Sequence, residues 1–142
     1  MNVRRLICYL CRNNISLYNF SWSRALEKTM LAYCGLKCLE CPVFRATKTN
    51  DEKLRIETAK NWSEYFENGV KPEELYCDGC HTPNGRIFGW CERCPVRLCA
   101  GKRQIQNCSF CDDYSCKNIM NIHEINPQAK QEIEKIFKNK TR

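Results

Sequence analysis

Hydrophobic side chains recur at three- and four-residue steps in the middle of the chain, a spacing typical of an amphipathic helix. Thr49 and Glu52 predict a capping box at its start, and Asn68, Gly69 and Pro72 predict where it stops. The residues on its apolar face are Ile56, Ala59, Trp62 and Phe66. We expect this helix to pack against the core and not to form a cofactor site.

Prolines mark the starts of three more helices. Pro42 suits the first turn of one short helix, and Pro95 suits another that carries Cys99. A C-terminal helix begins at Asn126-Pro127, and its predicted apolar stripe consists of Ala129, Ile133, Ile136 and Phe137. The lysines on the opposite face of this last helix are expected to be solvated.

Between these helices, Asn84-Gly85 is a strong signal for a two-residue β-hairpin turn. It lies between two Cys-x-x-Cys pairs, Cys77/Cys80 and Cys91/Cys94. Two such knuckles joined by a hairpin are the layout of a zinc ribbon. The predicted fold class is therefore a small metal-stabilised α+β domain, with short helices and a zinc-ribbon-like hairpin tied by cysteine knuckles and little regular sheet.

The composition leaves little material for a hydrophobic core. The chain has 142 residues, of which 43% are hydrophobic, but this fraction includes thirteen cysteines. The remaining leucine, isoleucine, valine and phenylalanine are few, and a chain this short would be only marginally stable if packing were its sole support. We expect one domain, and we expect the cysteines to supply the missing stability.

Residues 1–29 differ from the rest of the chain. They are poor in acidic residues, contain arginines and serines, and have few turn or capping signals. A transit peptide has this composition, but we favour a leader that is disordered or lies upstream of a true start at Met30. Cys8 and Cys11 then belong to this leader, and residues 30–142 form a single cysteine-rich metal-binding domain.

Metal binding explains the cysteines better than disulfide bonds do. The apolar run from Leu6 to Cys11 is too short for an export signal, and no later stretch is long enough to span a membrane. The cysteine count is odd, and most cysteines occur in Cys-x-x-Cys pairs, in which a tight turn lets two sulfurs face one ion. Backbone N–H groups in that turn offset the thiolate charge. We therefore expect a cytoplasmic protein with metal-bound thiolates.

Eleven cysteines after Met30 are the predicted metal ligands. In our preferred grouping a first ion is bound by Cys77, Cys80, Cys91 and Cys94. A second ion is bound by Cys99, Cys108, Cys111 and Cys116. Three cysteines remain and leave the fourth ligand position of a third site open: Cys34, Cys38 and Cys41. His81 or His123 could fill that position, as could water, a substrate or another cysteine. A surface or capping role is the alternative for each histidine, and neither is assigned as a ligand.

Zinc is the preferred metal, and a 4Fe–4S cluster is the alternative. The spacing of Cys34, Cys38 and Cys41 is the one with which radical S-adenosylmethionine enzymes bind a cluster. Cys41-Pro42 also resembles the closing Cys-Pro of ferredoxins. The chain after Cys41 is too short, however, for the barrel that radical chemistry requires. Zinc in a four-thiolate shell is therefore the simpler interpretation.

No motif in the sequence indicates a reaction. Trp90-Cys91-x-x-Cys94 resembles the thioredoxin active site, but the segment before it does not resemble a buried strand. The sequence contains no nucleotide-binding loop, Ser-His-Asp arrangement or paired catalytic carboxylates, and Asp112 or Asp113 is expected to cap a helix. We therefore favour a protein without enzymatic activity, an interaction or regulatory module for an unknown protein partner.

The net charge of +7 does not by itself indicate a nucleic-acid partner. Much of the excess lies before Met30, and thiolates formed at bound ions would offset the rest. No basic stripe with interleaved aromatics is present, only Arg97, Lys102 and Arg103 near the second proposed site. Nucleic acid is thus not a favoured partner, and the oligomeric state is not indicated.

The ordered series of motifs resembles a prokaryotic cysteine-rich family known as domain of unknown function, number 3795. The matching elements are Tyr33-Cys34-Gly35-Leu36, Cys38-x-x-Cys41-Pro42, Cys77-Asp78-Gly79-Cys80, Cys91-x-x-Cys94, Arg97-x-Cys99-Ala100, Asn107-Cys108-x-x-Cys111 and Asp113-Tyr114-x-Cys116. The resemblance covers residues 31 to about 120 and leaves residues 1–29 outside. It implies metal binding and a bacterial or archaeal source, and it supplies no activity.

Overall fold

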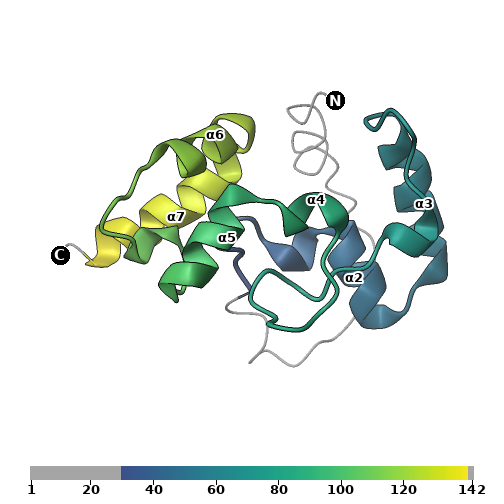
Figure 1. The fold of residues 1–142 in the computed structure, drawn as a ribbon, viewed down its shortest axis with the longest axis horizontal. Coiled ribbons are helices and arrows are strands. Elements are labelled where there is room, and N and C mark those ends of the chain that lie inside the picture. Colours follow the sequence, from purple (N-terminus) through teal and green to yellow (C-terminus); the bar gives the residue numbers. More distant parts are fainter. Residues whose placement is uncertain (1–29, 141–142) are drawn as a thin grey trace.

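The structure is a computed structural model that describes residues 30–140, so the expected leader with Cys8 and Cys11 lies outside the described residues. Within 30–140 the regular structure is helical. Its elements are η1 (Cys38–Glu40), α2 (Pro42–Thr49), α3 (Glu52–Ser63), η2 (Pro72–Glu74), α4 (Gly89–Glu92), α5 (Pro95–Arg103), η3 (Cys108–Phe110), α6 (Lys117–Ile125) and α7 (Pro127–Lys140), where η marks a 3₁₀ helix. Figure 1 shows α2 and α3 at one end of the molecule, α6 and α7 at the other, and α4 and α5 between them.

The predicted α+β fold class, with its zinc-ribbon-like hairpin, is wrong. Residues 30–140 contain no strand, and the only β-type pairing there is one isolated bridge between Leu31 and Lys37. The chain does reverse around Asn84, and the Asp78 N–H donates to the Arg86 carbonyl at 2.8 Å. The returning Arg86 N–H, however, donates to the Asp78 carboxylate at 2.9 Å. Because a side chain takes the place of the backbone acceptor, a β-ladder does not propagate from this turn.

Helix α3 exists as predicted but begins and ends elsewhere. Its N-cap is Asp51, whose carboxylate accepts the Leu54 N–H at 2.9 Å, and Thr49 instead ends α2. Ile56, assigned to the apolar face, has 52% of its surface exposed. The buried residues of α3 are Arg55, Thr58, Ala59 and Trp62. Arg55 is covered because its guanidinium lies 4.4 Å from the Tyr76 ring and donates to the Ala46 carbonyl.

The proline-initiated helices are confirmed. Pro42 and Pro95 begin α2 and α5, and α7 begins at Pro127, with the Asn126 side chain accepting the Ala129 N–H at 3.0 Å. The prediction that Asp112 or Asp113 caps a helix is wrong, because the next helix, α6, has Cys116 as its N-cap.

None of the helices in residues 30–140 has the length and apolar character needed to cross a membrane.

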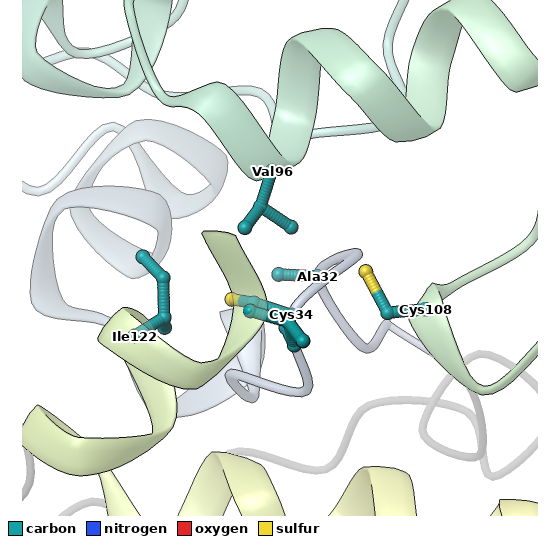
Figure 2. Packing of buried hydrophobic residues seen from close by; sticks show 6 residues of the cluster. Ala32, Cys34, Val96, Cys108 and Ile122 are labelled. Carbon is teal, nitrogen blue, oxygen red and sulfur yellow. The ribbon is translucent and has the colours of Figure 1, made fainter. Parts of the chain in front are cut away.

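Two clusters of buried hydrophobic side chains stand out in residues 30–140. The first core lies between the segment before η1, α5 and α6. It consists of Ala32, Cys34, Val96, Cys108, Ile119 and Ile122. Figure 2 shows two of its members, Cys34 and Cys108, in the same interior as three aliphatic side chains. The second core lies around α2 and α3 and consists of Val43, Ala59, Trp62 and Leu75. Neither cluster is large, as the composition predicts.

Helices α6 and α7 hold the Cys34 segment in place from one side. Gly35 has φ of +99°, and a Cβ built on it would lie 2.2 Å from the Ala129 carbonyl oxygen in α7. The His123 ring in α6 donates from Nε2 to the Cys34 carbonyl at 2.9 Å. The backbone of α7 can therefore approach this loop only because residue 35 has no side chain.

Candidate metal centre

The cysteine pairs are built on tight turns. In three of them the second cysteine's N–H donates to the first cysteine's carbonyl, at 3.0 Å for Cys38/Cys41, 3.3 Å for Cys91/Cys94 and 3.2 Å for Cys108/Cys111. In the fourth pair, Cys77/Cys80, Gly79 adopts φ of +100°, a conformation that glycine allows without strain. Each turn keeps the two cysteines of a pair close together.

Three cysteines occupy helix N-caps. Cys41 precedes α2, Cys94 precedes α5 and Cys116 precedes α6. The N-terminus of a helix carries a partial positive charge that favours a thiolate over a thiol. The Cys41 side chain forms no capping hydrogen bond. Hydrogen bonding from the Phe44 and Val43 N–H groups nevertheless favours its thiolate and acts to lower its pKa.

Seven of the eleven predicted ligands are linked to one another by electrostatic interactions and are here named the seven-cysteine group. Its members are Cys34, Cys38, Cys41, Cys77, Cys80, Cys91 and Cys94. Four of them belong to or pack against the first core, namely Cys34, Cys38, Cys80 and Cys94. Two others, Cys41 and Cys77, pack against the second core. The group therefore lies between the two hydrophobic cores. The three cysteines that the sequence left without a fourth ligand interact electrostatically with Cys77, Cys80 or Cys94 of the first predicted ion site.

Burial makes these thiols reluctant to ionise on their own. Desolvation, followed by the charges of neighbouring cysteines, raises the pKa of Cys38 and of Cys80 to about 12. Desolvation raises the pKa of Cys41 to about 11 and the pKa values of Cys34 and Cys91 well above the ordinary range. Buried thiolates in such a cluster need a nearby positive charge.

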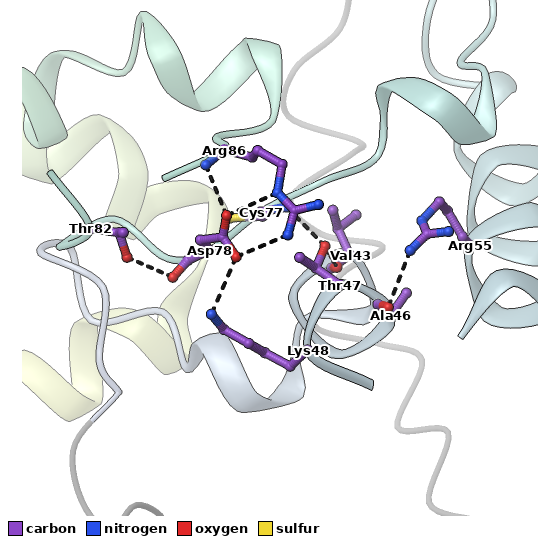
Figure 3. A network of polar contacts seen from close by, with 9 residues as sticks. All are labelled: Val43, Ala46, Thr47, Lys48, Arg55, Cys77, Asp78, Thr82 and Arg86. Atoms are coloured by element: carbon purple, nitrogen blue, oxygen red, sulfur yellow. Dashed lines mark hydrogen bonds and ion pairs between the residues drawn. The ribbon is translucent and has the colours of Figure 1, made fainter. Parts of the chain in front are cut away.

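Polar contacts join α2 to the loop that carries Cys77 and Cys80 (Figure 3). The Cys77 N–H donates to the Thr47 hydroxyl at 3.0 Å, and Lys48 Nζ lies 3.3 Å from the Asp78 carboxylate. Hydrogen bonds from Arg86 hold the pKa of Asp78 well below its usual range. These contacts place Cys77 and Asp78 beside Thr47 and Lys48, in the C-terminal half of α2.

The other four predicted ligands form the four-cysteine group, Cys99, Cys108, Cys111 and Cys116. All four line one cavity of about 20 Å³, room for about one water-sized particle. Burial, and then the charges of the other three, raise the pKa of Cys108 to about 12. The sequence-based grouping of these four is reproduced as a spatial arrangement, while their binding of a metal stays a prediction.

An arginine and an aspartate lie at the edge of this cavity. Arg103 Nη1 donates to Cys111 Sγ at 3.4 Å, and Nη2 donates to the Asp113 carboxylate at 2.6 Å. Asp113 itself lines the cavity. Arg103 thus links a carboxylate to a candidate ligand sulfur, the kind of outer contact that orients metal ligands.

With this geometry established, comparison with known proteins gives one match. Residues 30–121 match the model of a family described as "Protein of unknown function (DUF3795)". This chain belongs to the DUF3795 family. The resemblance drawn from the cysteine motifs is thereby confirmed, with nearly the same boundaries. No match was found among curated proteins or solved structures.

All eleven cysteines of both groups lie within the DUF3795 segment, and none of them is in a disulfide bond. A sulfur-only donor set of this kind fits zinc or an iron–sulfur cluster. Within residues 30–140, no three His, Cys, Asp or Glu side chains form a ready-made ion-binding set. Binding would therefore require the sulfurs of each group to rotate toward a common point.

Both histidines of the chain, His81 inside the DUF3795 segment and His123 just after it, contact backbone carbonyls. His81 Nε2 lies 2.9 Å from the Leu31 carbonyl, and its ring centroid lies 4.1 Å from that of Tyr33. His123 donates to the Cys34 carbonyl. Because a carbonyl only accepts, Nε2 carries the proton in both rings. Both histidines thus have structural contacts of the kind weighed as the alternative to ligation.

Sequence reasoning missed the arginines of α5 as parts of the site. Arg97 is electrostatically coupled to Cys80, and its Nε is buried with no hydrogen-bond partner among the described residues. Arg103 contacts Cys111. The available signal was spacing, since Arg97 follows Cys94 by three residues, one helical turn. Lysine and arginine are common on any helix surface, so this spacing did not distinguish Arg97 from an ordinary solvated arginine.

Proposed function

We propose that this DUF3795 protein is a structural zinc module, in which thiolate-bound ions hold two small hydrophobic cores together. The observation that carries the proposal is the position of the seven-cysteine group, which packs against both cores at once. Its role would be to present a stable surface to a protein partner, as an interaction or regulatory module without catalysis.

Energetics supports this role for the metal. Each core is too small to make a domain of this size stable through packing alone. A structural zinc site can contribute on the order of 10 kcal/mol to folding. A cation would also supply the positive charge that the buried sulfurs require before they ionise.

The chemistry of the ligands favours zinc as the resident ion. Tight Cys-x-x-Cys turns and sulfur-only donors are the usual composition of closed structural zinc sites. When bound, zinc supplies a fixed tetrahedral point of attachment and no redox chemistry. The residues themselves supply the turns, the helix N-termini and the desolvated surroundings.

The test is metal analysis combined with unfolding. Protein purified anaerobically under reducing conditions should be colourless and contain zinc in whole-number ratio to the chain. A strong chelator should abolish its cooperative thermal transition followed by circular dichroism, and added zinc should restore it. The proposal is overturned if the metal-free protein melts cooperatively at the same temperature. Brown protein that contains iron and sulfide, with broad absorbance at about 400 nm, would assign an iron–sulfur cluster instead.

A further inference from the structure

Two cysteines are more deeply covered than the others. Of the cysteines in residues 30–140, Cys34 and Cys108 are buried, and the rest are partly exposed. The two lie far apart in the sequence, but the Cys108 N–H donates to the Tyr33 carbonyl at 2.9 Å, so the segments that carry them are in contact. Both cysteines also belong to the first core. An element that covers both segments would therefore control access to the two buried sulfurs.

The N-terminal half of α7 lies against the segment that carries Cys34. A Cβ built on Gly35 would lie 2.2 Å from the Ala129 carbonyl oxygen and 2.7 Å from Cγ1 of Ile133. Ala129 and Ile133 are also the buried residues of this helix. Close packing of this kind tolerates little displacement. This half of α7 is therefore firmly anchored.

The C-terminal half of α7 reaches the η3 turn through contacts nearer the surface. Lys140 Nζ donates to the Ser109 carbonyl at 3.3 Å and lies 4.0 Å from the centre of the Phe110 ring. The Phe137 ring lies 4.9 Å from the Tyr114 ring. Lys140 and Phe110 are exposed, while Phe137 and Tyr114 are half-buried. A segment with few buried apolar contacts opens more readily than its surroundings.

We propose that α7 is a strap over Cys34 and Cys108, whose C-terminal half opens and closes over η3 and so controls access to Cys108. Cys34 stays covered in this motion, because the anchored half remains in place. The inference goes beyond the proposed function, since it holds whether or not zinc is bound. The family match does not supply it either, because α7 lies after residues 30–121, the segment that the DUF3795 model matches.

Amide hydrogen exchange of the full chain, followed by NMR, tests the strap. Lys140→Ala removes the hydrogen bond to the Ser109 carbonyl and the contact with the Phe110 ring. It should speed exchange of the Cys108 amide by about two- to fivefold, the effect of losing an exposed cation–π contact. The Cys77 amide, which donates to the Thr47 hydroxyl of α2, should exchange at the wild-type rate.

Lys135→Ala is the matched control. It removes the same type of side chain from the same helix, but Lys135 Nζ pairs with Glu132 inside α7, at 2.9 Å. The Cys108 amide should therefore exchange at the wild-type rate in this variant. An unchanged Cys108 amide in Lys140→Ala would overturn the strap. An equal rise at Cys77 would also overturn it, because the whole protein would then have been destabilised.

Thiol access provides a second readout and separates this inference from the proposed function. Brief alkylation with iodoacetamide, located by fragment-ion mass spectrometry, should modify Cys108 faster in Lys140→Ala than in Lys135→Ala, with Cys34 and Cys77 unchanged. Equal rates at Cys108 in the two variants would contradict the control of access by α7. Zinc is measured in the same samples. Protein without zinc would overturn the proposed function alone, and the rates decide the strap in either case.

Discussion

Individual side chains determine where charge is tolerated in this protein. Asp78 accepts hydrogen bonds from the backbone and side chain of Arg86, so its carboxylate is held in the charged form. The buried cysteines experience the opposite effect, because desolvation opposes their ionisation. Arginines therefore matter most where they reach a sulfur, and Arg103 does so directly at Cys111.

Replacing Arg103 should weaken metal retention in the four-cysteine group. Arg103→Gln removes the donor to Cys111 and the partner of Asp113. Outer contacts of this kind are typically worth about 10- to 100-fold in metal affinity, and we expect the lower end because Arg103 is 45% exposed. The measurement is the rate of zinc transfer to a colorimetric chelator.

Lys102→Gln is the matched control for this experiment. It removes the same charge one residue away, from a side chain that makes no hydrogen bond to a sulfur in the described part of the chain. It should release zinc at the wild-type rate. Equal release rates for the two variants would show that net charge, and not the Arg103 contact, governs retention.

At the scale of elements, helix starts follow local rules while helix neighbours do not. Pro42, Pro95 and Pro127 begin helices where the sequence places them. The face that each helix buries depends on what packs against it, which is why α3 buries Arg55 and exposes Ile56. The approach of α7 to the Cys34 loop is likewise a tertiary feature, and it depends on Gly35.

Two glycines should respond in opposite directions to alanine substitution. Gly35→Ala should destabilise the protein by at least about 1–3 kcal/mol, because its positive φ is strained for alanine and its Cβ would clash with α7. Gly101→Ala lies inside α5 with open space around the new methyl group. It should stabilise by about 0.5–1 kcal/mol. Urea unfolding of the zinc-loaded proteins measures both, and a neutral Gly35→Ala would contradict the packing described for α7.

At the scale of the whole molecule, cysteines contact both hydrophobic cores of residues 30–140. The first core contains cysteines as members, and the second has Cys41 and Cys77 at its edge. Polar contacts from α2 to the Asp78 loop add a further connection. If ions bind between the cores, the two halves should unfold together when loaded and separately when stripped.

Single-tryptophan variants can follow each core. Trp62 is buried in the second core, and Trp90 packs against the first. With zinc bound, fluorescence from the two probes should report one denaturation midpoint, the sign of a two-state transition. After chelation the midpoints should separate or the transitions should lose cooperativity. Coincident midpoints in metal-free protein would show that packing alone couples the cores.

The sequence by itself determined the family, the proline-initiated helices, the scarcity of core residues and the set of cysteines. These depend on local spacing and composition, which are properties of neighbouring residues. It also brought Cys99, Cys108, Cys111 and Cys116 together correctly, because they are close along the chain.

Only the tertiary structure decided the rest. The prediction of a β-hairpin was wrong because the Asp78 carboxylate, and not a backbone carbonyl, accepts the Arg86 N–H. The Asn-Gly signal carries no information about this side-chain contact. The grouping of Cys34, Cys38 and Cys41 with Cys77 and Cys80 crosses more than thirty residues of chain, and it depends on how α2 packs beside the Asp78 loop. Long-range placement of this kind is set by packing and burial, which no local spacing records.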